Sequence, residues 1–136
     1  MASRINTVLL IDDDTTINYL HNRLLEKNAF TNEVAISING MEGLESFMQL
    51  NNKIEAEELA IVFLDLNMPI MNGWEFLENL SKLKDGITIN YKIFILSSTI
   101  NPDDKKKAKE NELVTGFLTK PLTKEHLEFI KTEHLQ

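Results

Sequence analysis

Four short apolar runs in this sequence each end in polar side chains of the kinds that bind metal ions and phosphate groups. The polar residues are Asp12 and Asp13 after the first run, Asp65 after the second, Ser97 after the third and Lys120 after the fourth. Apolar runs of this length, bounded by turn residues, are typical of strands buried on both faces of a parallel sheet. Because ligands bind at the carboxyl edge of such a sheet, we expect these five side chains to meet there.

The three aspartates predict a metal ion at that edge. Two carboxylates about 4 Å apart repel by roughly 4 kcal/mol at an effective dielectric near 20. Asp12, Asp13 and Asp65 therefore cannot all stay ionised without a cation between them. Magnesium is the expected ion, because it takes hard oxygen ligands and is often held by one or two carboxylates together with a phosphate. Lys120 would supply a second positive charge.

A carboxylate, a magnesium ion, a lysine and a hydroxyl together describe a site that accepts a phosphoryl group. Aspartate can act as a nucleophile that forms an acyl phosphate, and the rest of the work is positioning and charge neutralisation. We predict that Asp65 is the nucleophile. Lys120 and magnesium would offset charge on the phosphoryl oxygens, and Ser97 would donate one hydrogen bond to them.

The elements that must position these residues alternate between strand and helix. Amphipathic segments predict helices, and the weakly alternating residues 30–36 predict a strand at the edge of the sheet. The expected helices cover residues 15–27, 40–50, 74–84 and 102–111, with a fifth beginning after Thr123. Five β-α units with right-handed connections give a doubly wound α/β domain.

Several local features are expected from the residue pattern. The first helix has an apolar stripe at Ile17, Leu20, Leu24 and Leu25, and the fourth offers only Ala108 to a core, so it should be the least firmly held. Polar residues 51–58 predict a surface loop, and Asn72-Gly73 allows a positive φ. His21, His126 and His134 lack metal-ligand spacing, and we expect them at the surface.

Composition and charge exclude several other classes of protein. The 136 residues carry a formal charge of −7 and no cysteine, which argues against binding to the phosphate backbone of nucleic acid and excludes a disulfide framework. The longest apolar run, residues 59–64, is far shorter than the ~20 residues of a membrane helix. We expect one domain over residues 1–136 and a cytoplasmic location.

At these residues the sequence resembles the receiver domain of bacterial-type response regulators over essentially its whole length. The resemblance is carried by four motifs in order and at the proper spacing. They are the acidic pair after the first strand, residues 64–73 (LDLNMPIMNG), the hydroxyl in residues 96–98 (LSS) and residues 119–121 (TKP). It implies a flavodoxin-like domain of five parallel strands in the order 2-1-3-4-5 with five helices.

The resemblance also implies roles for individual residues. Asp65 would take a phosphoryl group from the phosphohistidine of a histidine kinase or a histidine phosphotransfer protein. Magnesium would be held by Asp13, Asp65 and the backbone carbonyl of Asn67, with Asp12 acting through water. The Lys120-Pro121 peptide bond would be cis. Such a domain accepts a phosphoryl group and is not otherwise an enzyme, although it can catalyse its own phosphorylation and dephosphorylation.

In this family the hydroxyl residue, here Ser97, shifts toward the new phosphoryl group while an aromatic side chain rotates inward behind it. That aromatic is Phe117 here, where many members carry tyrosine, so the switch is expected to be weaker or purely steric. No output domain follows within the 136 residues. We expect a stand-alone receiver that docks on a downstream protein through its fourth helix, fifth strand and fifth helix, or passes the phosphoryl group to a histidine-bearing partner.

Three alternative readings remain at this point. Residues 12–16 (DDDTT) also satisfy D-x-D-x-T, the opening motif of haloacid-dehalogenase-like phosphatases, in which Asp12 would be the nucleophile. That reading leaves Asp65 unexplained, and no later pair of acids completes the magnesium site. A receiver-like interaction module that is not phosphorylated would be expected to lack site residues, and none is missing here. A flavodoxin-like cofactor binder lacks a Ser/Thr/Gly-rich phosphate loop after the first strand.

Overall fold

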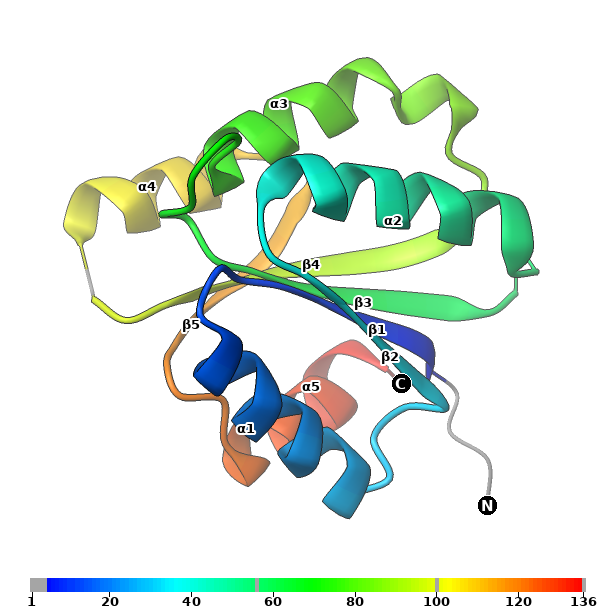
Figure 1. The fold of residues 1–136 in the computed structure, drawn as a ribbon, viewed down its shortest axis with the longest axis vertical. Helices are drawn as coiled ribbons and strands as arrows, with labels where there is room; N and C mark the ends of the chain where they lie inside the picture. Colours follow the sequence, from blue (N-terminus) through cyan, green and yellow to red (C-terminus); the bar gives the residue numbers. More distant parts are fainter. Residues whose placement is uncertain (1–4, 56, 100, 136) are drawn as a thin grey trace.

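The computed structural model describes residues 5–55, 57–99 and 101–135, which form a five-stranded sheet between two layers of helices (Figure 1). The strand order is β2-β1-β3-β4-β5, and every neighbouring pair is parallel. This confirms the doubly wound α/β fold and its order 2-1-3-4-5. In chain order the elements are β1 (Ile5–Ile11), α1 (Thr15–Lys27), β2 (Glu33–Ser37), α2 (Gly40–Lys53), β3 (Leu59–Leu64), α3 (Gly73–Lys82), η1 (Lys84–Gly86), β4 (Asn90–Ser97), α4 (Pro102–Glu110), β5 (Val114–Thr119) and α5 (Lys124–His134).

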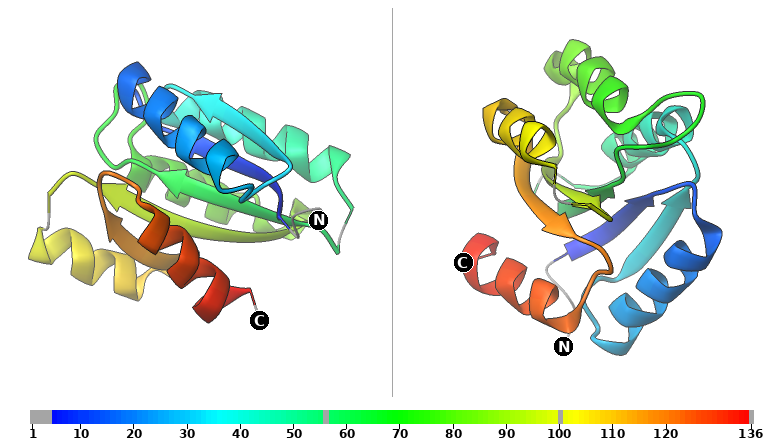
Figure 2. Two further views of the ribbon diagram at one scale, coloured as in Figure 1. Left: turned by 90° about the horizontal axis from the view of Figure 1, so that it is seen from below. Right: turned by 90° about the vertical axis from the view of Figure 1, so that its left-hand side faces the viewer.

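Helices cover both faces of the sheet. Helices α2, α3 and α4 lie on one face, and α1 and α5 lie on the other (Figures 1 and 2). Alternate side chains of a strand point to opposite faces, so each central strand feeds two cores. In β1, Leu9 and Ile11 pack on the side of α2 and α3, whereas Val8 and Leu10 pack on the side of α1 and α5. Burial on both faces explains why these strands are continuous apolar runs.

Three of the strands begin at positions that differ from those expected. β1 and β4 begin earlier than their apolar runs, because Ile5 and Asn90 each pair in the sheet with Leu59, the first residue of β3. β2 begins later, at Glu33, and Phe30 is a fully buried residue ahead of the strand. The carboxyl ends of the central strands lie where the sequence predicted them, and these ends position the polar residues.

The inward face of α1 was predicted correctly at Leu25, which is fully buried, and at Leu24, which packs against the core, but not at Leu20. Leu20 is 52% exposed, and the buried residues of the helix are Asn18, His21 and Leu25. These three positions are spaced by three and four residues and share one face, whereas Leu20 is turned about 100° from His21. The polar pair can be buried because both side chains have backbone partners in neighbouring loops. Asp14 caps the helix by accepting hydrogen bonds from Thr16 N and Ile17 N.

Helix α2 continues beyond its predicted end. It runs to Lys53, so the predicted loop over residues 51–58 is wrong in its first part. Asn51 is 8% exposed, its side chain donates to Gly86 O at 2.7 Å, and it accepts from Thr88 N at 2.8 Å. From the sequence a polar residue such as Asn51 suggests a loop, but here its side chain forms hydrogen bonds with the backbone of a distant turn at residues 86–88.

Helices α4 and α5 begin as predicted. Asn101 caps α4 ahead of Pro102, and Ala108 is the buried residue of this helix. Thr123 caps α5, whose inward residues Leu127 and Ile130 are fully or almost fully buried. None of the helices in the described part of the chain is long and apolar enough to cross a membrane.

Candidate functional site

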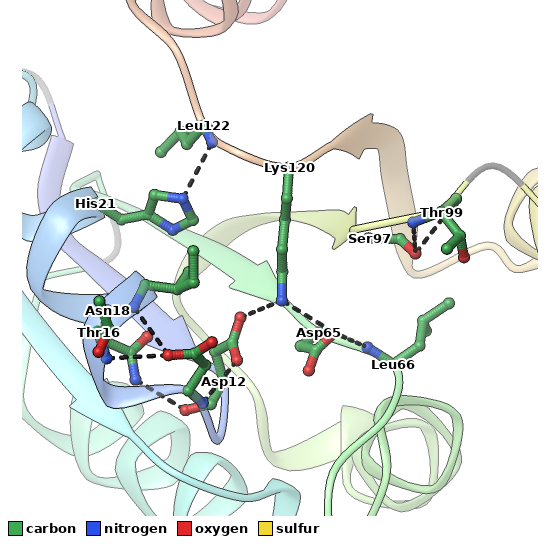
Figure 3. A network of polar contacts seen from close by, with 12 residues as sticks. Asp12, Thr16, Asn18, His21, Asp65, Leu66, Ser97, Thr99, Lys120 and Leu122 are labelled. Carbon is green, nitrogen blue, oxygen red and sulfur yellow. Dashed lines mark hydrogen bonds and ion pairs between the residues drawn. The ribbon is translucent and has the colours of Figure 1, made fainter.

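The carboxyl ends of β1, β3, β4 and β5 bring the predicted polar residues to one edge of the sheet (Figure 3). Asp12, Asp13 and Asp65 each offer a carboxylate oxygen, and these three atoms lie within 4.8 Å of one another. Lys120 reaches down between two of the acids from the loop after β5. Ser97 lies at the end of β4 but is turned elsewhere.

Lys120 bridges two of the carboxylates. Its Nζ lies 2.5 Å from Asp12 Oδ2 and 3.4 Å from Asp65 Oδ1, and its side chain is 12% exposed. Burial alone would lower the pKa of Lys120, but the hydrogen bond and charge of Asp12, together with those of Asp65, outweigh burial and raise the pKa. The side chain therefore remains an ammonium ion beside Asp65.

Asp65 is held in an environment that disfavours its charge. It is 8% exposed, and burial raises the pKa of its carboxyl group, with the neighbouring charge of Asp12 acting in the same direction. Lys120 and the hydrogen bond from Leu66 N to Asp65 Oδ1, at 3.0 Å, lower the pKa but only in part. A carboxylate that is poorly compensated in this way attracts a further cation.

Asp12 is fixed through its main chain as well as its side chain. Its N–H donates to Ser37 O at 3.0 Å, and its carbonyl oxygen accepts from Asn18 Nδ2 at 2.8 Å. Its carboxylate also accepts from Asp14 N at 2.9 Å. Asp13, between two anchored neighbours, is exposed to solvent.

These residues suit a magnesium ion. Three hard carboxylate oxygens in one group, two from nearly buried residues and one from an exposed residue, form a donor set that magnesium accepts with room for waters or a phosphate. Asn67, two residues beyond Asp65, is exposed at the start of the loop to α3. Its carbonyl as a ligand stays a prediction.

The loop from β3 to α3 depends on Gly73 for a reason that differs from the one expected. No described glycine has a positive φ, Asn72 has φ −80°, and the left-handed residue in this loop is Ile70 with φ 70°. A Cβ on Gly73 would lie 2.5 Å from Asp65 O and 2.9 Å from Leu66 Cα. The predicted positive φ at Asn72-Gly73 is therefore wrong, and the glycine is needed so that α3 can begin against the backbone of Asp65.

Ser97 does not contact Asp65 in this structure. Its hydroxyl donates to Thr99 O at 3.0 Å and accepts from Thr99 N at 3.3 Å, and the residue is 4% exposed (Figure 3). To bond a phosphoryl oxygen the hydroxyl would have to leave Thr99. Phe117 is partly exposed and lines a cavity of about 320 Å³ between α4 and β5, together with Lys105, Ala108 and Lys109.

The chain around Lys120 is anchored at its start. Lys120 N donates to Ser97 O at 2.7 Å, which ties the loop to the end of β4. The Lys120-Pro121 peptide bond is cis, as predicted.

Sequence reasoning missed Asn18 and His21. His21 was expected at the surface, but it is 2% exposed, and its Nε2 accepts from Leu122 N at 3.0 Å. The available signal was the spacing of Asn18 and His21 from Leu25, which places all three on one face of α1. His126 and His134 are partly buried rather than exposed, one in the cap of α5 and the other against the Phe94 ring.

The chain is similar to known proteins in sequence and in fold. The family profile described as response regulator receiver domain matches residues 8–130. The chain is 29% identical over 117 residues to two-component response regulator 24 of Arabidopsis thaliana, a match that covers 86% of this chain and 75% of that protein. A crystal structure of a two component response regulator from Cytophaga hutchinsonii has a TM-score of 0.83 at 26% identity, covering 96% of this chain and 97% of that one.

A further relative contains this domain as a small part. Protein-glutamate methylesterase/protein-glutamine glutaminase 1 of Paramagnetospirillum magneticum is 32% identical over 93 residues, which cover 68% of this chain and 21% of that protein. Because the match spans about a fifth of that relative, its enzymatic activity is not carried over to this chain.

Proposed function

Because this chain belongs to the response regulator receiver domain family, we propose that it works in two-component signalling by accepting a phosphoryl group on Asp65. The observation that carries this assignment is the position of Asp65. Its carboxylate lies within 4.8 Å of oxygens from Asp12 and Asp13 and 3.4 Å from the ammonium of Lys120. No other carboxylate in the described part of the chain combines such a cluster with a place at the end of the central strand.

The reaction is a displacement at phosphorus. One carboxylate oxygen of Asp65 attacks the phosphoryl group of a phosphohistidine on a histidine kinase or a histidine phosphotransfer protein. An O–P bond forms, the P–N bond breaks, and the donor nitrogen keeps the electron pair. If the second ring nitrogen of the donor carries a proton, the departing imidazole is neutral. Lys120 favours the ionised form of Asp65 beforehand and then neutralises charge on the transferred group.

Magnesium would be held by Asp13, Asp65 and the backbone carbonyl of Asn67, with Asp12 bound through a water molecule. When bound, it supplies positive charge that offsets the phosphoryl oxygens. The protein's own contribution is to keep the acids fixed by backbone hydrogen bonds, so that little reorganisation is needed.

Phosphorylation would be read out at the surface formed by α4, β5 and α5. Ser97 would exchange Thr99 for a phosphoryl oxygen, and Phe117 would move into the space behind it. Phe117 borders α4, which has one buried residue and is therefore easily displaced. The surface would then bind a downstream protein, with no direct contact to nucleic acid or membrane, in the cytoplasm. A single receiver domain over residues 1–136 remains part of this proposal.

The experiment is peptide mass spectrometry after incubation with a small acyl phosphate and magnesium. We expect a gain of one phosphoryl group on Asp65 that requires magnesium, is lost in Asp65→Asn and is kept in Asp85→Asn, a control at an exposed aspartate. A label on Asp12 that survives in Asp65→Asn would favour the phosphatase reading. Absence of any label would favour an unphosphorylated interaction module. Size exclusion and pull-down that find identical partners for both forms would contradict the docking step.

A further inference from the structure

His21 is a buried imidazole that the proposed chemistry does not use. It lies on α1, is 2% exposed, and its Nε2 accepts a hydrogen bond of 3.0 Å from the backbone N–H of Leu122. The two residues are separated by 101 positions in the sequence. Leu122 is itself 5% exposed, so its N–H has little access to water. Without the imidazole, this donor would be left buried and unpaired, which the chain avoids strongly.

Leu122 lies two residues beyond Lys120, in the loop that positions the site's ammonium group. This loop is held at two points. Lys120 N donates to Ser97 O at 2.7 Å on the side of β4, and Leu122 N donates to His21 on the side of α1. In Figure 3 the His21 ring extends from α1 and its hydrogen bond rises to Leu122, while Lys120 extends from the same loop down to Asp12.

The same face of α1 also holds the acidic partner of Lys120. Asn18 lies three residues before His21, and its Nδ2 donates to Asp12 O at 2.8 Å. One turn of one helix therefore fixes the main chain beside Asp12 and the main chain beside Lys120. The contact of 2.5 Å between Asp12 Oδ2 and Lys120 Nζ joins the two segments that these anchors hold.

We propose that His21 is a positioning residue for phosphoryl transfer, which keeps Lys120 over Asp12 and Asp65 by accepting the hydrogen bond of the Leu122 amide. This inference rests on the proposed function and deepens it. The hydrogen bond that His21 accepts comes from the Leu122 amide and not from a group of the proposed magnesium site. It acts through the loop, and a small displacement of a group that neutralises charge is costly for the rate.

The chain allows a matched set of variants. In His21→Gln the side-chain oxygen is separated from Cα by the same number of bonds as Nε2, so it can accept from Leu122. In His21→Leu no acceptor remains. Leu25→Ala, one turn further along the same buried face, weakens the packing of α1 but leaves both partners of the His21–Leu122 hydrogen bond in place. If His21→Leu does not fold, His21→Asn replaces it, because its oxygen is one bond too short.

Two measurements test the proposal. The first is the maximal rate at which Asp65 is labelled by a small acyl phosphate with magnesium. We expect His21→Leu to be slower by about ten-fold or more, His21→Gln to be within about three-fold of the wild type, and Leu25→Ala to keep the wild-type rate while folded. The second is the ¹⁵N resonance of the Lys120 ammonium, expected to shift in His21→Leu and to return in His21→Gln.

Each outcome decides the matter. Wild-type labelling in His21→Leu, or equal losses in His21→Gln and His21→Leu, would overturn the positioning role. Slowing by Leu25→Ala to the same extent would show that helix stability, not the hydrogen bond, controls the rate. If the wild type takes no label on Asp65, the proposed function fails. The Lys120 resonance then decides by itself whether His21 sets the position of the lysine.

Discussion

The ammonium nitrogen of Lys120 lies 2.5 Å from Oδ2 of Asp12, and the two side chains are 12% and 7% exposed. A cation that binds these acids must therefore share them with a positive charge already in place. Breaking a nearly buried ion pair leaves an uncompensated charge, which is strongly unfavourable. If the charge of Lys120 were removed, the unpaired carboxylates of Asp12 and Asp65 would attract a divalent cation more strongly.

We predict that Lys120→Met binds magnesium about ten-fold more tightly than the wild type, because a competing positive charge a few ångströms away is removed. The same variant should be less stable without magnesium and should lose most of its phosphorylation. Isothermal titration with magnesium measures the first effect. Lys109→Met, which removes an exposed lysine, is the control and should change the affinity by less than about two-fold. Unchanged or weaker binding in Lys120→Met would show that the lysine does not oppose the ion.

Asp65→Asn should stabilise the fold in the absence of magnesium. Burial and the charge of Asp12 raise the pKa of Asp65 above its unfolded value of 3.8. The contribution of such a group is fully favourable below the unfolded pKa and is lost as pH rises through the folded pKa. At neutral pH the ionised Asp65 therefore costs stability. Removing its charge should increase the free energy of unfolding by about 0.5 to 2 kcal/mol, as at other functional sites.

Urea unfolding at neutral pH measures this gain, and repetition near pH 3 should find it largely abolished. Asp13→Asn is the matched control, since Asp13 is exposed and belongs to the same cluster. A destabilised Asp65→Asn at neutral pH would mean that Lys120 compensates Asp65 fully.

Gly73→Ala should damage the site through the backbone. The new Cβ would lie 2.5 Å from Asp65 O and 2.9 Å from Leu66 Cα, and backbone atoms cannot move aside without shifting the loop. We expect a loss of about 2 kcal/mol in stability, together with slower phosphorylation. Gly86→Ala is the control, because nothing lies within 4 Å of its added Cβ. It should be neutral or stabilising by up to about 1 kcal/mol. Equal effects of the two variants in thermal unfolding would contradict the steric argument.

His21 should make stability depend on pH. Burial lowers the pKa of His21 below its ordinary 6.5; Asp12 and Asp14 oppose this shift, and Lys120 and His126 add to it. Below that pH the unfolded chain takes up a proton that the folded chain resists, so stability falls as pH falls from 6.5 toward the lowered folded value. Between about pH 7.5 and pH 5.5, the wild type should lose more stability than His21→Gln. Urea titrations at both pH values measure the difference. Parallel losses in the two proteins would show that His21 is not held neutral.

The fold was predictable because each central strand is a short, continuous apolar run, which is typical of a strand buried on both faces of a parallel sheet. Residues 61–64 are such a run, and the polar residue that follows each run marks the carboxyl edge of the sheet. The cluster around Asp65 followed from that topology alone. What the sequence could not provide was contact information between distant segments. His21 and Asn51 look like surface residues until the backbone groups that they satisfy are known.

The hydrogen-bond partner of the Ser97 hydroxyl could not be predicted from the sequence either. A hydroxyl at the end of β4 was predictable, but its bond to Thr99 depends on the path of the following loop. The position of Gly73 illustrates the same limit. A turn-forming pair suggested a left-handed backbone, whereas the structure needs a residue without a side chain because α3 begins against Asp65.

Helix α4 should be the least protected helix, with one aromatic contact contributing to its attachment. Ala108 is its buried residue, and Nζ of Lys107 lies 4.4 Å from the centre of the Trp74 ring on α3. A cation–π contact at an exposed site contributes about 0.5 to 1 kcal/mol. Hydrogen exchange measured by mass spectrometry should be faster in α4 than in α3, which buries Phe76, Leu77 and Leu80.

Lys107→Ala should accelerate exchange in α4 by about two- to five-fold, the factor that corresponds to the loss of this contact. Lys106→Ala removes the same charge from the neighbouring exposed position and is the control, for which we expect no more than a small change. Trp74 fluorescence provides a second observable, because the ring loses its cation only in Lys107→Ala. Slower exchange in α4 than in α3, or equal acceleration by both alanine variants, would show that α4 is held by something other than Ala108 and Trp74.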